Sequence, residues 1–210
     1  MMKKTKVYLA GKIKPHDWRH KFVNIRGEFM CWDVEEDPIW YDKELEFNEK
    51  IDIVGPWFIS CDHSCYHGER SHGVGAWKHV ACTGTDPIDD VFVSEICEIQ
   101  IKKSDVVFAY IDDDTCFGSL WEIGYAYALK KKVILLFDTT KRQRDMWFIS
   151  NCANISVSKE GLLSNEHHML SHWTANKELS NVADDIITKL LMNKYNKTNV
   201  VWQKPKMKWN

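Results

Sequence analysis

Carboxylates that could act in catalysis or binding lie in one stretch of the sequence, where an apolar run ends and a helical pattern begins. Three aspartates at 112–114 come directly after the apolar run 105–111, and a helical pattern opens near Ser119. In open parallel sheets, ligands bind beyond the carboxyl ends of strands, where loops meet the N-termini of helices. Glu122 is expected in the first turn of that helix, facing the same crevice. This stretch is therefore the candidate site.

Glu122 also fits a purely structural role. Residues 119–122, Ser-Leu-Trp-Glu, match a capping box, in which the serine accepts from the glutamate N–H and the glutamate reaches back to the serine N–H. On this tetrapeptide alone, capping is the favoured interpretation, because Ser-x-x-Glu before an apolar run is common. The polar loop before it and the strand before that keep the site interpretation open.

A second group of reactive side chains lies in residues 61–85, which are rich in Cys, His and Gly, lack periodicity and predict a loop. Zinc prefers cysteine and histidine, but the loop has no C-x₂-C pair, and the alternating pattern cannot converge on a metal without a special loop. Three interpretations stay open: a bare polar loop, a zinc site, or a loop that covers the candidate site and supplies Asp62 or a histidine as proton donor. The zinc ligands would be Cys61, His63, Cys65 and His67.

The elements that must position these residues follow a strand–helix–strand pattern. The sequence predicts strands at 7–9, 105–111 and 132–137, and helices from Asp86 to about Lys103, from about Ser119 to Lys130, and from Ser180 with Asp184 and Asp185 in its first turn. Residues 31–50 fit a half-buried helix or a solvated excursion, and short extended pieces flank Gly55-Pro56. Right-handed crossovers make such strands parallel. We expect a single α/β domain with a central, mostly parallel sheet flanked by helices, in a flavodoxin- or Rossmann-like layering.

The length of the chain predicts one domain, and its net charge argues against nucleic-acid and membrane partners. A chain of 210 residues with 44% hydrophobic residues is long enough for one well-buried domain, here 1–195 with the 61–85 insertion, followed by a basic tail at 196–210. Lys+Arg 28 against Asp+Glu 30 gives a formal charge of −2, so neither a nucleic-acid nor a membrane partner is expected. The odd count of seven cysteines and the lack of a secretory pattern predict a cytoplasmic protein with reduced thiols.

Three motifs together resemble one protein family. VYLAGKI at 7–13, SDVVFAYID at 104–112 and GSLWEIGYAYALKKKVILL at 118–136 are similar, in order and spacing, to the nucleoside 2-deoxyribosyltransferase family. The same superfamily includes nucleotide N-glycoside hydrolases and is related to NAD-cleaving domains. The resemblance implies cleavage of the bond between C1′ and the base of a (deoxy)nucleoside or nucleotide, with transfer of the sugar to another base. It implies no metal or organic cofactor, and a homo-oligomer with sites completed across subunits.

The resemblance also implies roles for individual residues. Glu122 matches the nucleophile, a carboxylate that attacks the anomeric carbon and holds the sugar as an ester, and Tyr8 matches the tyrosine that orients it. Asp145 falls near the position of a residue that reaches into a neighbouring subunit's site. With the strand-end aspartates and the loop histidine, the candidates for substrate contact are Ala10, Gly11, Asp112, Asp114, Gly118, Ser119, Asp145 and His63.

Two positions depart from the family pattern. Cys116 and Cys97 stand where the family carries aspartates that hold and protonate the leaving base. Nearby replacements for that acid are Asp112, Asp114, Glu95 and Glu98. Two alternatives to base transfer therefore stay open: a hydrolase acting on nucleotides, NAD or an ADP-ribose derivative, and a non-catalytic nucleotide-binding sensor. Trp121 and Trp147 are expected in the core or at an interface rather than as platforms for a base.

Overall fold

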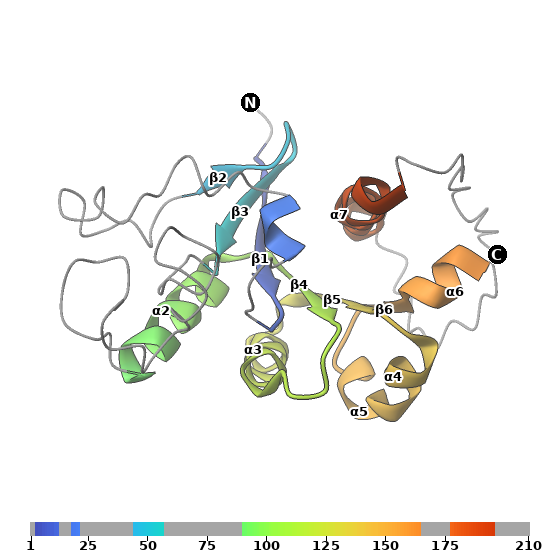
Figure 1. The fold of residues 1–210 in the computed structure, drawn as a ribbon. Helices are drawn as coiled ribbons and strands as arrows, with labels where there is room; N and C mark the ends of the chain where they lie inside the picture. The colour runs from blue at the N-terminus through green and yellow to red at the C-terminus, as the bar shows by residue number, and fades with distance from the viewer. Residues whose placement is uncertain (1–2, 13–17, 22–43, 57–89, 165–176, 196–210) are drawn as a thin grey trace, which may run out of the picture.

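The fold is known from a computed structural model, which describes residues 3–12, 18–21, 44–56, 90–164 and 177–195 (Figure 1). The described part contains a six-stranded sheet in the order β2-β3-β1-β4-β5-β6. Only β2 runs antiparallel to its neighbour, and the other four pairings are parallel. The predicted α/β class with a mostly parallel sheet is confirmed. The strands are β1 Thr5–Ala10, β2 Leu45–Glu46, β3 Ile51–Gly55, β4 Val106–Ile111, β5 Lys132–Phe137 and β6 Ile155–Ser158.

Helices cover both faces of this sheet. The long helix α7 lies on one face, and α3, with α2 beside it, lies on the other (Figure 1). The shorter helices α4, α5 and α6 follow β5 and β6 along the chain. The helices are the 3₁₀ helix η1 Trp18–Lys21, α2 Asp90–Lys103, α3 Phe117–Ala128, α4 Thr140–Asp145, α5 Trp147–Ser150, α6 Lys159–Ser164 and α7 Lys177–Tyr195.

Strand alternation decides which side chains of β1 face the candidate site. Val7 and Leu9 pack into the core cluster that includes α7, whereas Tyr8 and Ala10 pack into the cluster that includes α3. Successive side chains of a strand point to opposite faces of the sheet, and here both faces are buried, as in parallel sheets generally. Tyr8 is therefore directed toward the helix that carries Glu122.

The strand order also predicts where a ligand would sit. The chain passes from β1 to β3 on one side and then crosses to β4 on the other side of β1. The carboxyl ends of β1 and β4 are neighbours, with Ala10 paired to Ala109. Such a reversal of strand order opens a crevice between adjacent connections, which is the usual ligand site of open α/β sheets.

Several predicted boundaries were wrong. Helix α3 begins at Phe117 rather than near Ser119, so Glu122 lies beyond the first turn. Helix α7 begins at Lys177 rather than Ser180, which places Asp184 and Asp185 well inside the helix. The helical interpretation of residues 31–50 fails for its described end, because Leu45 and Glu46 pair with β3 as an edge strand.

The remaining predictions concern two tryptophans and several segments outside the described residues. Trp121 is 44% exposed and Trp147 58% exposed, so neither lies in the core, and a place at an interface stays a prediction. The Cys/His-rich segment with its possible zinc ligands, the start of the helix predicted at Asp86 and the basic tail lie outside the described residues. In the part of the chain that is described, no helix is long and apolar enough to cross a membrane.

Candidate active site

The centre of the candidate site is a buried pair formed by Tyr8 of β1 and Glu122 of α3. The Tyr8 hydroxyl donates a hydrogen bond to Oε1 of Glu122. Tyr8 is fully buried, and Glu122 retains 9% of its surface exposed. Residues 114 positions apart in the sequence meet here because α3 packs on the face of the sheet to which Tyr8 points.

Burial places the Glu122 carboxyl in an unusual protonation range. Loss of hydration disfavours the charged form and raises the pKa of Glu122 to about 7, against the opposing effects of the Tyr8 hydrogen bond, the charge of Arg19 and the Cys97 hydrogen bond. Burial likewise raises the pKa of Tyr8 well above its usual value. Near neutral pH, Glu122 is therefore close to half ionised, while Tyr8 keeps the proton that it donates.

Cys97 of α2 is the third member of this group. Its thiol is a hydrogen-bond partner of both Tyr8 and Glu122. Burial, reinforced by the negative charge of Glu122, raises the pKa of Cys97 to about 12, so the thiol stays protonated at neutral pH. The side chain of α2 that lies at the Tyr8–Glu122 pair is thus a weak acid.

The two carboxylates of α2 considered as proton donors have other surroundings. Glu98 accepts hydrogen bonds from Lys102 and from the Tyr125 hydroxyl, and these contacts lower its pKa. Glu95 is exposed on the same helix. Cys97, between them on the helix, interacts with Glu122 through its side chain.

The capping interpretation of Glu122 is wrong. The residue at the N-cap of α3 is Cys116, which makes no side-chain capping hydrogen bond, and Ser119 lies inside the helix. Glu122 directs its carboxylate to Tyr8 instead. Because the Glu122 carboxylate binds Tyr8 and not the N-terminus of α3, capping of the helix does not explain why a glutamate stands here.

Arg19 is a residue near the site that was not predicted from the sequence. It is 2% exposed in η1, and its positive charge acts on both Glu122 and Cys97. Its side chain binds the backbone carbonyls of Leu9 and Gly11 at the end of β1. The sequence signal was modest, an arginine beside a tryptophan a few residues after a strand end, because a buried role for arginine arises only from tertiary contacts.

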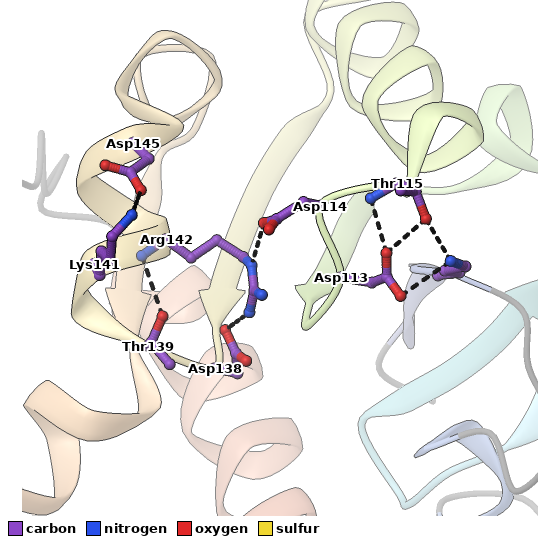
Figure 2. A network of polar contacts seen from close by, with 9 residues as sticks. Asp113, Asp114, Thr115, Asp138, Thr139, Lys141, Arg142 and Asp145 are labelled. Atoms are coloured by element: carbon purple, nitrogen blue, oxygen red, sulfur yellow. Dashed lines mark hydrogen bonds and ion pairs between the residues drawn. The ribbon is translucent and has the colours of Figure 1, made fainter.

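The strand-end aspartates form a polar network beyond the carboxyl end of β4. Asp113 accepts from the backbone N–H of Thr115 at 2.8 Å, from its hydroxyl at 2.7 Å and from Lys12 Nζ at 3.0 Å (Figure 2). The Thr115 hydrogen bonds, helped by Lys12, hold the pKa of Asp113 well below its usual range. Lys12 follows β1 and Asp113 follows β4, so this contact ties together the two strand ends at the reversal of strand order.

Arg142 of α4 extends the network to β5. Its Nε donates to Asp114 at 2.7 Å, and its Nη1 donates to Asp138 (Figure 2). Asp145, on the same helix, is exposed and forms an ion pair with Lys141, on the opposite side of Arg142 from Asp113 in this view. Asp114 and Asp145 are thus paired with cations, Arg142 and Lys141 respectively. Asp112, the first residue after β4, is half-buried.

The glycines and small residues among the candidates differ in what surrounds them. A Cβ on Gly11 would lie 2.8 Å from Trp18 Nε1 and 3.0 Å from the Tyr110 carbonyl oxygen, so the close approach here is to protein. A Cβ on Gly118 would meet no heavy atom of the described residues within 4 Å. Ala10 and Ser119 are buried in β1 and α3, and His63 lies outside the described residues.

Comparison with known proteins adds no name to this site. No family model matches the chain, and no curated protein matches it. The chemistry of the site therefore rests on its geometry: a buried carboxylate near half ionisation, oriented through one oxygen by a tyrosine. Such a group can attack an electrophilic carbon or exchange a proton with a substrate near neutral pH.

Proposed function

We propose that this protein cleaves the N-glycosidic bond of a (deoxy)nucleoside or nucleotide and transfers the sugar to another base, with Glu122 as the nucleophile. The observation that carries the proposal is the hydrogen bond from the buried Tyr8 hydroxyl to Oε1 of Glu122. That bond fixes one carboxylate oxygen and so orients the other. It also pairs two residues that the resemblance to nucleoside 2-deoxyribosyltransferases assigns to orientation and attack.

The proposed reaction is a double displacement at C1′ of the sugar. An oxygen of the Glu122 carboxylate forms a bond to C1′ while the C1′–N bond breaks, and the departing nitrogen takes the electron pair of that bond and a proton from water. The transition state has oxocarbenium character, which a nearby carboxylate stabilises. A nitrogen of the second base then attacks C1′ and gives up its proton to water, the ester bond breaks with its electron pair going to the Glu122 oxygen, and the carboxylate is restored. Water in place of the second base would give hydrolysis.

A second candidate is favoured by Cys97. The thiol beside Glu122 has a pKa of about 12 and is a poor proton donor at neutral pH, although departure of an ordinary base benefits from protonation. Nicotinamide needs no such proton, because it is bound to the sugar as a pyridinium cation and departs neutral. Cleavage of NAD or an ADP-ribose derivative through the same Glu122 ester is therefore the alternative.

A chromatographic assay separates these candidates. Purified protein is incubated with deoxyinosine or thymidine, with and without adenine, and in parallel with the monophosphates and with NAD. Formation of deoxyadenosine that requires free adenine is the expected result. Release of base without exchange would replace transfer by hydrolysis, and release of nicotinamide alone would favour the second candidate. Binding of nucleosides by folded protein with no turnover of any compound would contradict both and favour a sensor.

A further inference from the structure

Helix α3 turns an uncharged face to solvent. Its exposed residues are Phe117, Gly118, Trp121, Gly124, Tyr127 and Ala128. An exposed helix face is ordinarily lined with charged and polar side chains, yet Glu122, the one charged residue of this helix, is buried. Phe117 is 72% exposed, although phenylalanine is among the residues most often found inside proteins. An exposed apolar surface of this kind is typical of a face that another protein covers.

Four of these residues form one row along the outer side of α3: Phe117, Trp121, Gly124 and Ala128. Their spacing of four, three and four positions keeps them on a single side of the helix, and it is the spacing found in helices that pack lengthwise. The first two side chains of this α3 row are large, and the last two are small. The Trp121 ring is already held in place, because it stacks on Tyr125 with 5.2 Å between the ring centres.

Gly124 is not explained by the packing of the described chain. Glycine inside a helix is destabilising relative to alanine, so it is expected where another group approaches the backbone closely. A Cβ on Gly124 would meet no heavy atom of the described residues within 4 Å. These residues therefore do not make the close approach, and the backbone of α3 is open to a partner at this point.

We propose that the α3 row packs antiparallel against the same row of a second copy of this chain and so forms a two-fold dimer. A two-fold axis between Trp121 and Gly124 places Trp121 of each copy opposite Gly124 of the other, and Phe117 opposite Ala128. Each layer of the contact then joins one large and one small side chain, which fills the space between the helices. In a parallel pairing, Phe117 would face its own copy, and the layer at Gly124 would be left empty.

The exposed apolar area is close to what a stable dimer needs. Helix α5 packs into the same core cluster as α3, on the same face of the sheet (Figure 1). The two helices together carry five aromatic residues that are between 44% and 72% exposed: Phe117, Trp121, Tyr127, Trp147 and Phe148. At about 200 Å² for a whole aromatic side chain, they expose about 600 Å². Each partner of a standard interface buries about 800 Å², so these side chains supply most of such an area.

Sedimentation velocity of the purified chain, from about 1 to 100 µM, measures the association. We expect a dimer in the wild type, and we expect Gly124→Arg to weaken it at least about 30-fold, as loss of an interface hot spot does. The variant should keep the circular dichroism of the wild type, because arginine favours a helix more than glycine does. The matched control is Asn181→Arg, which adds the same charge at an exposed position of α7, on the other face of the sheet, and should leave the dimer intact.

Photo-crosslinking tests the antiparallel direction and does not depend on the folding of Gly124→Arg. Phe117 is replaced by benzoylphenylalanine, and the crosslinked peptides are mapped by mass spectrometry. We expect a crosslink to the segment of α3 around Ala128. Because positions 117 and 128 are about 16 Å apart within one helix, this crosslink must join two copies.

Four results would overturn the proposal. They are a chain that stays monomeric over the whole concentration range, a dimer that Gly124→Arg leaves intact, an equal loss of the dimer in Asn181→Arg, and a crosslink between the two Phe117 ends. A monomer would also indicate that a different protein covers the α3 row. Neither measurement uses a substrate, so the dimer and the proposed function can fail independently.

Discussion

Replacing Glu122 by glutamine is expected to reduce the rate of base exchange by roughly a thousand-fold or more, the scale on which removal of a nucleophile acts. An amide cannot form the glycosyl ester, whereas its oxygen can still accept from the Tyr8 hydroxyl that now binds Oε1. The fold should therefore persist while the chemistry is lost. The rate is measured by chromatography under single-turnover conditions with deoxyinosine and adenine.

The chain offers a matched control in Glu98. This carboxylate lies on the neighbouring helix α2, one residue from Cys97, but binds Lys102 and Tyr125 rather than the Tyr8–Glu122 pair. Glu98→Gln should retain turnover close to that of the wild type. A folded Glu122→Gln protein with turnover within ten-fold of the wild type would show that this carboxylate is not the nucleophile.

The same substitution is expected to stabilise the protein at alkaline pH. The pKa of Glu122 rises from an ordinary 4.5 to about 7 on folding, so the folded state binds the proton more tightly than the unfolded chain. Stability therefore falls as pH increases from about 4.5 to about 7, and above that range the buried carboxylate costs about 3 kcal/mol. Glutamine carries no such charge. At pH 8.5, Glu122→Gln should melt about 5–10 °C above the wild type, and the difference should shrink toward pH 4.

The control for stability is again Glu98, because its shift has the opposite sign. Hydrogen bonds from Lys102 and Tyr125 lower its pKa, so its contribution is present above the unfolded value and lost on acidification. Glu98→Gln should bring no gain at pH 8.5. Melting curves from pH 4 to 9, followed by circular dichroism, provide the measurement. A gain for Glu122→Gln that is absent at pH 8.5, or equal at both ends of the range, would contradict the assigned burial of charge.

The loss of turnover and the gain in stability expected for Glu122→Gln together distinguish a catalytic from a structural role of this residue. A substitution that removes activity and also stabilises the fold marks a residue kept at a cost to stability. Glu122 is buried, and loss of hydration is the main cause of its shifted pKa. A carboxylate whose role was to stabilise its helix would show the opposite behaviour.

The unit β4–α3–β5 was predictable because its signals are local. The apolar runs 106–111 and 133–137 are long enough to indicate strands buried on both faces. The helix predicted between them was confirmed, with both of its ends two residues earlier than predicted. That start was wrong because Ser119 and Glu122 imitate a capping box. The tertiary contact with Tyr8 decides the position of the glutamate, and no local pattern encodes it.

Other elements depend on contacts that a local pattern does not contain. Strand β6 has only two apolar residues, and its Ser156 and Ser158 are buried. The side-chain amide of Gln143, in α4, donates a hydrogen bond to the backbone carbonyl of Ser156 at 3.0 Å. This bond offsets the cost of burying the polar side chain of Gln143. This strand was therefore not predicted from the sequence. Arg19 was not predicted for the same reason, since its side chain binds the backbone carbonyls of Leu9, in β1, and of Gly11, just after the strand.

The most direct test of the central claim is detection of the sugar on Glu122. Protein mixed with deoxyinosine in the absence of an acceptor base is quenched in acid within the first turnover, and its intact mass is compared with that of Glu122→Gln treated identically. The account predicts an increase by one deoxyribosyl group, which peptide mapping assigns to Glu122 and which disappears when adenine is added before the quench. Turnover without any adduct, or an adduct on another residue, would contradict it.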